Sequence, residues 1–126
     1  MIVLDASLLI AHLAVDDAHQ DAAFEILDTE DDLLVHPLTL AEALVFPAKV
    51  GTEQADRARI ESLGVELRDE DPDEPVRIAR LRASTALKLP DCCVLATAAR
   101  SDATLATFDR RLADAARERG IDVVGA

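Results

Sequence analysis

The chain has 126 residues, of which half are hydrophobic, and its formal net charge is −12 at pH 7. This length fits one domain, residues 1–126, that buries roughly two-thirds of its unfolded surface. No run approaches the ~20 apolar residues of a membrane span and no signal-peptide pattern opens the chain, so we expect a soluble cytoplasmic protein without a membrane partner. The acidic charge argues against general nucleic-acid binding through a basic surface, but a bound cation would reverse the sign of an acidic cleft.

Short apolar runs alternate with amphipathic stretches along the chain. The runs that predict strands are residues 2–4, 33–36, 65–67, 103–107 and 121–124. The stretches that predict helices are one beginning at Ser7 and those at 19–27, 39–50, 52–63, 76–87, 92–100 and 109–119. Two helices in succession occur at 39–63 and at 76–100, so strands and helices do not alternate strictly. The pattern predicts an α/β fold of three layers, with helices on both faces of a four- or five-stranded parallel sheet.

Four acidic residues occupy positions that this fold would bring to one edge of the sheet. Asp5 ends the first strand, and Asp109 follows the strand at 103–107. Asp91 follows Pro90 at a predicted helix start, where the helix dipole favours an anion. Glu42 lies among apolar neighbours in "LAEAL", where an unpaired carboxylate is costly to bury. Because sites in open parallel sheets form outside the carboxyl ends of the strands, we expect these side chains to converge.

Each acid also has a simpler interpretation. Asp5 or Asp91 alone is more often a helix cap than a ligand, and Glu42 alone could face solvent. The coincidence of four such positions favours a site, because clustered carboxylates repel one another unless a cation neutralises them. Oxygen ligands of this kind suit Mg²⁺ or Mn²⁺, which activate water and stabilise the entering and leaving oxygens of a phosphodiester. The residues by themselves therefore predict an acidic metal site.

The histidines and cysteines predict no second metal site. Adjacent cysteines such as Cys92 and Cys93 are poorly placed for a mutual disulfide, and two thiols alone make no zinc framework, so we expect them to fill the core. His12, His19 and His36 are not spaced with one another or with cysteine as zinc ligands are, and we expect none of them to carry catalysis.

Charged side chains cluster in two further stretches. The segment "RDEDPDEP", residues 68–75, predicts a solvated connection. The basic residues after it have two interpretations, the wet face of an amphipathic helix or phosphate contacts at the edge of an acidic cleft, and the first is the simpler. These residues are Arg77, Arg80, Arg82 and Lys88.

The segments "IVLDAS", "HPLTLAEAL", "LPDCCVLATA" and "LATFDRRL", in this order and over residues 2–124, resemble those of PIN-domain nucleases, and most closely the VapC-type toxins of toxin–antitoxin pairs. The resemblance implies a three-layer PIN-like fold and a Mg²⁺- or Mn²⁺-dependent endoribonuclease. Such an enzyme hydrolyses phosphodiester bonds in single-stranded regions of structured RNA, such as tRNA or rRNA, and leaves a 5′-phosphate and a 3′-hydroxyl.

The resemblance also assigns roles to residues of this chain. Asp5 and Asp91 match the main metal ligands of the family, while Glu42 and Asp109 match acids that complete the ligand shell through water or at a second metal. Two hydroxyl residues, Ser7 and Thr107, match positions that orient those acids or a bound water. The chain departs from the family pattern at Cys92 and Cys93, where small or aliphatic residues are more usual, and in its acidity.

The resemblance implies two protein partners. One is an antitoxin with a basic C-terminal segment, whose Arg enters the acidic pocket because a guanidinium can take the place of the cation. The other is a second copy of the chain, since many helix positions are apolar. The alternative function is a non-catalytic acidic PIN-like module that binds a basic protein.

Two other enzyme-like folds fit the sequence poorly. A phosphoacceptor receiver domain needs an adjacent acidic pair after the first strand and a lysine after a late strand, but Ala6 and Ser7 follow Asp5, and the only lysines are Lys49 and Lys88. A phosphatase with an Asp nucleophile would need a second Asp at the position of Ser7.

Overall fold

The computed structural model describes residues 1–14, 16–30 and 32–126. Its centre is a parallel sheet of five strands in the order β3-β2-β1-β4-β5. The strands are β1 (Ile2–Leu4), β2 (Leu33–Val35), β3 (Val65–Leu67), β4 (Thr104–Ala106) and β5 (Val123–Val124). The predicted α/β fold with a parallel sheet is confirmed, and each predicted strand is present, three of them shorter than expected.

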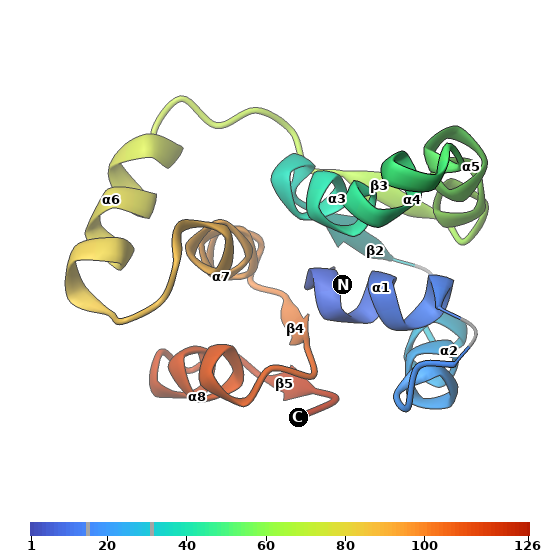
Figure 1. Cartoon of the computed structure of the whole chain (residues 1–126). Coiled ribbons are helices and arrows are strands. Elements are labelled where there is room, and N and C mark those ends of the chain that lie inside the picture. The colour runs from blue at the N-terminus through green and yellow to red at the C-terminus, as the bar shows by residue number, and fades with distance from the viewer. Residues whose placement is uncertain (15, 31) are drawn as a thin grey trace.

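Helices connect the strands in chain order (Figure 1). They are α1 (Ala6–Leu13), α2 (Gln20–Asp28), α3 (Pro37–Ala43), α4 (Val45–Val50), α5 (Glu53–Ser62), α6 (Glu74–Ser84), α7 (Leu89–Ser101) and α8 (Arg110–Glu118). As predicted, pairs or triplets of helices separate most strands. The chain therefore crosses from β1 to β2 and β3 on one side, and then returns past β1 to place β4 and β5 on the other.

The two faces of the sheet belong to two separate cores, which confirms the three layers. On β1, the side chains of Ile2 and Leu4 join one buried cluster and that of Val3 joins the other. The first cluster includes residues of α1, α2, α3 and α5, and the second includes residues of α7 and α8. A strand covered on both faces reads as a continuous apolar run, which is why "IVL" shows no alternation of polar and apolar residues. The outermost helix is α6, which packs against α7 (Figure 1).

The helix predicted at 39–50 is two helices in the structure. α3 ends at Ala43 and α4 begins at Val45, with Leu44 between them. The break has a local cause, because Pro47 has no N–H to donate to the carbonyl of Ala43, and its ring crowds that carbonyl. Gly51 ends α4 with a φ of 81°, a left-handed conformation that favours glycine.

The prediction that residues 68–75 form a solvated connection holds for Asp69, Glu70 and Asp73, which are exposed, and is wrong for the other three ionic side chains. Arg68 donates to Glu74, and Asp71 accepts from Arg77 at 2.7 Å, with Arg100 3.7 Å away. The side chains of Arg68 and Asp71 are only 8% and 9% exposed. The packing of α6 on α7 brings Arg77 and Arg100 to Asp71, so these charges are paired instead of hydrated.

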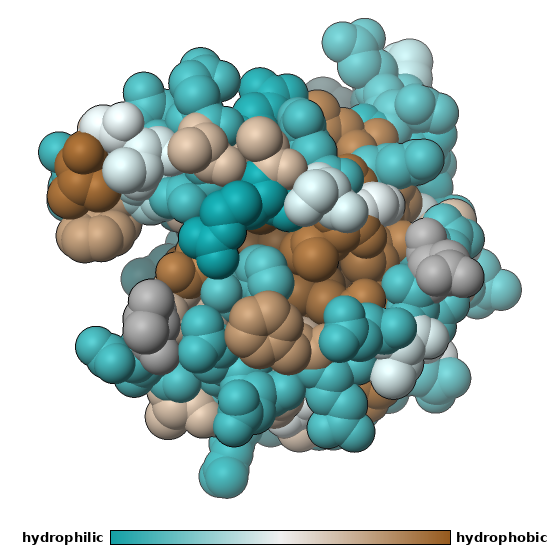
Figure 2. Space-filling view, turned by 90° about the vertical axis from the view of Figure 1, so that its right-hand side faces the viewer, coloured by the Kyte–Doolittle hydropathy of each residue, from teal (hydrophilic) through white to brown (hydrophobic). Residues whose placement is uncertain are grey.

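No helix in the described ranges is long and apolar enough to cross a bilayer. Seen from the side of α2 and α5, the molecule exposes apolar surface in the middle of the face, and hydrophilic side chains surround it (Figure 2). Large hydrophobic side chains with substantial exposure include Ile10, Val45, Phe46 and Val50.

His12 is buried in the first core, as an edge-to-face partner of Phe24 with ring centroids 4.7 Å apart. Its Nδ1 has no hydrogen-bond partner among the described residues. Burial, followed by the charge of Arg59, lowers the pKa of His12 below its usual 6.5, and Asp28 opposes this only in part. The native fold therefore holds His12 in its neutral form.

This burial predicts a pH-dependent contribution to stability. Because the folded pKa of His12 is lowered, the unfolded chain takes up the proton first, so the contribution is fully present above about pH 6.5 and is lost as the pH falls through the folded pKa. We expect His12→Leu to lose less free energy of unfolding than the unmodified chain between pH 7 and pH 5, as measured by urea denaturation. Equal losses in the two proteins would contradict neutral burial.

Candidate functional site

The candidate site lies where the strand order reverses. The chain leaves β1 for β2 on one side, and β4 flanks β1 on the other, and parallel sheets with such a reversal typically bind ligands in a crevice outside the carboxyl ends of these strands, here β1 and β4. Asp5 directly follows β1 and Thr107 directly follows β4. The Asp5 N–H donates to the carbonyl of Ala106 at 2.9 Å, which holds the two strand ends together.

The Asp5 carboxylate is buried, with 6% of the residue exposed, and is held by two hydroxyls. Ser7 Oγ and Thr107 Oγ1 both donate to Asp5 Oδ2, each at 2.8 Å. Each hydroxyl also accepts a backbone hydrogen bond, Ser7 from the N–H of Phe108 at 3.1 Å and Thr107 from that of Asp109 at 3.0 Å. The backbone bonds orient the hydroxyl protons toward Asp5, and no other described group donates to Oδ1, which is left for a further ligand.

Asp91 lies in the first turn of α7, where Pro90 needs no N–H partner. It is half-buried and caps nothing: Lys88 occupies the N-cap position. Burial raises the pKa of Asp91, and the nearby carboxylates of Asp5 and Asp109 raise it further, while Lys88 and Arg111 lower it. The first turn of α7 thus holds the Asp91 carboxylate near the carboxylates of Asp5 and Asp109.

Glu42 projects from the second turn of α3 and is also half-buried. Burial raises the pKa of Glu42 first, and the carboxylates of Asp5 and Asp91 add to the effect. The apolar neighbours in "LAEAL" are explained by the core, since Leu40 and Ala43 are buried in the first cluster. The charged groups that act on the Glu42 carboxylate are therefore other acids. Such a group of negative charges is unfavourable unless a cation neutralises it.

Asp109 is the most exposed of the four acids. Its Oδ1 accepts from the N–H of Arg111 at 2.9 Å, so it is the N-cap of α8. The side-chain cap considered for Asp5 and Asp91 is thus made by Asp109 instead, and the charge of Asp109 still reaches Asp91. One carboxylate can cap a helix through one oxygen and face the crevice with the other.

The structure brings the four acids to one edge without forming a closed cage. The charges of Asp5 and Asp91 act on Glu42, and those of Asp5 and Asp109 act on Asp91, yet no three of the four have carboxylate oxygens within 4.8 Å of one another in the described residues. This spacing fits a hydrated Mg²⁺ or Mn²⁺, which keeps several waters and takes one or two carboxylates directly. The raised pKa values of Glu42 and Asp91 mean that protons compete with a cation as the pH falls.

The basic side chains that were candidates for phosphate contacts separate in space. Lys88 lies near Asp91, and Arg111, which the sequence did not single out, lies there as well. Arg77 and Arg80 instead line an open cavity of about 480 Å³ between α6 and α7, together with Arg100. Only Lys88 of the predicted set is therefore placed beside the acidic site by its effect on Asp91.

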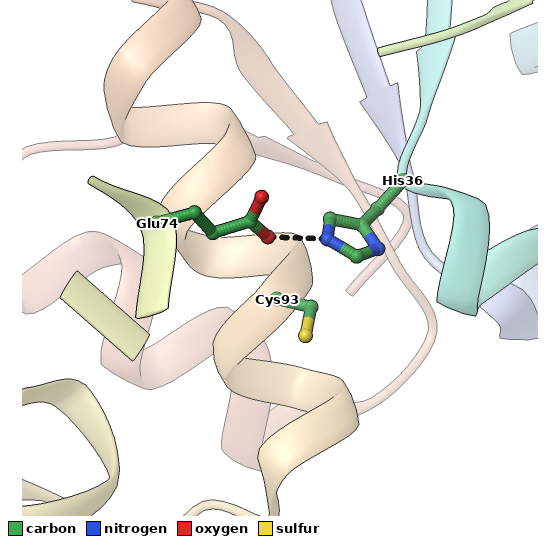
Figure 3. A group of neighbouring side chains, drawn as sticks. All are labelled: His36, Glu74 and Cys93. Atoms are coloured by element: carbon green, nitrogen blue, oxygen red, sulfur yellow. Dashed lines mark hydrogen bonds and ion pairs between the residues drawn. The ribbon is translucent and has the colours of Figure 1, made fainter. Parts of the chain in front are cut away.

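His36, Glu74 and Cys93 form a second polar group, from the end of β2, the start of α6 and the first half of α7 (Figure 3). Their potential ligand atoms all lie within 4.8 Å of one another. The sequence spacing of His36 and Cys93 is not that of zinc ligands, yet these residues, 57 positions apart, meet in space where α3 packs against α7. Sequence spacing gave no signal of this group.

Hydrogen bonds within this group disfavour a metal. His36 Nδ1 accepts from the N–H of Leu38 at 3.0 Å and so caps α3, which places the ring proton on Nε2, the atom that faces Glu74 Oε1. The other oxygen of Glu74 accepts from Arg68. A metal bound to Nε2 would leave the ring proton on Nδ1. Nδ1 could then no longer accept the hydrogen bond from Leu38 that caps α3. Burial also raises the pKa of the Cys93 thiol to about 11, so this sulfur is a neutral side chain of the core.

Comparison with known proteins gives a family and a set of similar folds. The family model described as PIN domain matches residues 2–118. A toxin–antitoxin complex from Klebsiella pneumoniae has a chain with 24% identity, a TM-score of 0.73, and 90% of each chain covered. The sarcin–ricin loop cleaving toxin VapC20 from Mycobacterium tuberculosis has 14% identity and a TM-score of 0.76, with 91% of this chain and 95% of that chain covered.

A third similar structure is VapBC2 from Rickettsia felis bound to a DNA fragment from its promoter. It has 16% identity and a TM-score of 0.73, with 98% of this chain and 97% of that chain covered. At these identities the structural similarities establish a shared fold. No curated protein sequence matches the chain.

The hydroxyl pair beneath Asp5 predicts a measurable stability cost. Thr107→Val removes one donor from a buried carboxylate and leaves the Asp109 N–H without its acceptor, which should destabilise the fold by about 1–3 kcal/mol. The matched control is Thr97→Val, because Thr97 is equally buried but only bonds back to the carbonyl of Cys93 within α7. We expect chemical denaturation to show a smaller loss for Thr97→Val. A loss for Thr107→Val no greater than that of the control would contradict the role of the hydroxyl.

Proposed function

Because this chain belongs to the PIN domain family, we propose that it is a metal-dependent endoribonuclease. The observation that carries the proposal is the buried Asp5 carboxylate, held by Ser7 and Thr107 at the mouth of the β1–β4 crevice. Asp91 and Glu42 lie near it, and their pKa values are raised by burial first and by the neighbouring carboxylates in addition. Such a group of acids is unfavourable alone and is suited to a divalent cation.

In this proposal each residue has a distinct role. Asp5 and Asp91 are the main ligands of Mg²⁺ or Mn²⁺, and Glu42 and Asp109 complete the ligand shell through water or at a second ion. A bound divalent cation supplies an activated water and neutralises charge on the phosphate. Ser7 and Thr107 fix the Asp5 carboxylate by donating to one of its oxygens. Lys88 and Arg111, both near Asp91, attract the phosphate of the substrate.

We further propose that the chain is the toxin of a type II, VapBC-type toxin–antitoxin pair that acts in the cytoplasm. Support comes from the fold shared with the Klebsiella and Rickettsia complexes and with VapC20, whose name states that it is a toxin that cleaves the sarcin–ricin loop. The proposed substrate is therefore a single-stranded region of a structured RNA such as tRNA or rRNA. The family match over residues 2–118 supports one domain for residues 1–126.

A homodimer is also proposed. Exposed apolar side chains on α4, including Phe46 with 70% exposure, give the chain a surface that association would cover. The alternative to the enzyme is a non-catalytic acidic module that binds a basic protein. The presence of the complete set of four acids, with Asp5 held by two hydroxyls, favours the enzyme.

The decisive experiment compares Asp5→Asn with the unmodified chain. We expect Asp5→Asn to lose at least about 100-fold of the Mn²⁺-dependent cleavage rate, since even outer-shell partners of a metal typically contribute about 10–100-fold. Sequencing of RNA 5′-phosphate ends after induced expression should identify the cleavage site, and the ends should disappear in the variant. Mn²⁺ should also raise the melting temperature of the unmodified chain and not that of Asp5→Asn.

Asp114→Asn is the matched control, because the side chain of Asp114 is 73% exposed on α8 and belongs to no part of the crevice. Its cleavage rate should equal that of the unmodified chain. If Asp5→Asn cleaved RNA as fast as this control, the proposed enzyme would be wrong. The non-catalytic module would then be the better interpretation.

The acidic crevice also predicts how an antitoxin inhibits. A basic C-terminal tail should place a guanidinium among the four acids and compete with the divalent cation. We expect inhibition to weaken as the Mn²⁺ concentration rises, and to be lost when every Arg and Lys of the tail is replaced by Gln, measured with the cleavage assay. Full inhibition by the neutral tail would show that the tail acts by another route.

A further inference from the structure

Two ring side chains stack at the rim of the candidate site. The rings of His19 and Phe108 are nearly parallel, at 13°, with centroids 4.4 Å apart. Rings are scarce in this chain, which has three Phe, three His, and neither Trp nor Tyr. The pair joins the start of α2 to the connection between β4 and α8.

Phe108 belongs to the backbone of the site itself. It lies between Thr107, whose hydroxyl donates to Asp5, and Asp109, one of the four acids. Its own N–H donates to Ser7 Oγ at 3.1 Å. The backbone of Phe108 is therefore bonded to a hydroxyl that holds Asp5, so the stack contains a residue adjoining the candidate site.

Both rings are held by ordered backbone. His19 donates its N–H to Asp17 Oδ1 at 2.8 Å, and its carbonyl accepts from Ala23 at 2.9 Å in the first turn of α2. Behind Phe108 lies Gly125, with a φ of 100°. A Cβ at Gly125 would lie 3.3 Å from two ring carbons of Phe108 and 2.5 Å from the carbonyl oxygen of Thr107, so only glycine leaves the ring this space.

We propose that the His19–Phe108 stack is a nucleobase-binding platform for the nucleotide next to the scissile phosphate, an inference that rests on the proposed ribonuclease function. His19 is exposed and Phe108 is half-buried, so a base extends the stack from the His19 side. Unpaired bases in RNA loops are commonly bound by stacking on aromatic or histidine rings. Stacking on a ring adds affinity that does not come from positive charge, which suits a chain with a net charge of −12.

The simpler interpretation is that the stack only joins α2 to the β4–α8 connection. The two interpretations differ in one observable, because a purely structural pair would affect stability and leave RNA affinity unchanged. The test therefore needs a readout that reports on a stacked base directly. Quenching of 2-aminopurine, a fluorescent adenine analogue whose emission falls when it stacks, is such a readout.

The experiment uses the full chain with Asp5→Asn as background, so that the probe is not cut. The probe is a 12-nucleotide single-stranded RNA of mixed sequence in which each position in turn carries 2-aminopurine, titrated in Mg²⁺. We expect quenching at one or two adjacent positions. Adding His19→Ala should remove the quenching and weaken binding by at least about fivefold, whereas His19→Phe should retain both within about twofold.

Phe24→Leu is the matched control, since Phe24 forms the other ring pair of the chain, with His12, away from the crevice. It should leave quenching and affinity unchanged. Equal affinity and quenching in His19→Ala and the background protein would overturn the platform, as would an absence of quenching in the background protein. Cleavage by otherwise unmodified His19→Ala at the unmodified rate, with cleavage abolished by Asp5→Asn, would reject the platform and leave the proposed function intact.

Discussion

The structure is organised around one buried charge. Asp5 lies between the ends of β1 and β4, where two hydroxyls donate to one of its oxygens and the backbone N–H groups of residues 108 and 109 fix those hydroxyls in turn. This arrangement requires that β1 and β4 be neighbours, although Ala106 lies 102 positions after its partner Leu4, and the chain returns to β1 through α6 and α7. Much of the fold therefore serves to keep a carboxylate in a place where it is unfavourable without a counter-charge.

Most of the fold could be predicted from the sequence because its elements follow local rules. Strands covered on both faces appear as apolar runs, and glycine at positions such as 51 ends a helix where a left-handed residue is needed. The positions of Asp5 and Thr107 at strand ends could also be predicted, since parallel strands share one carboxyl edge. The break at Leu44 was missed, although Pro47 carried the signal for it.

What the sequence could not show depends on contacts between distant segments. Nothing in the spacing of His36, Glu74 and Cys93 indicates that they meet, and "RDEDPDEP" gives no sign that Arg100 will stand beside Asp71. The sequence likewise does not indicate that Arg111 lies near Asp91, because nothing in the local pattern distinguishes it from other charged residues of α8. These are side-chain pairings set by how α6, α7 and α8 pack, and local patterns carry no information on that packing.

The two outer strands of the sheet are too short to favour association between molecules by strand pairing. β3 has three residues and β5 only two, so each rim offers very few free backbone groups to a strand from another copy. Short rims of this kind discourage the edge-to-edge growth that leads to aggregates. Short rims thus favour assembly through side chains on helix surfaces, where complementarity of shape selects the partner.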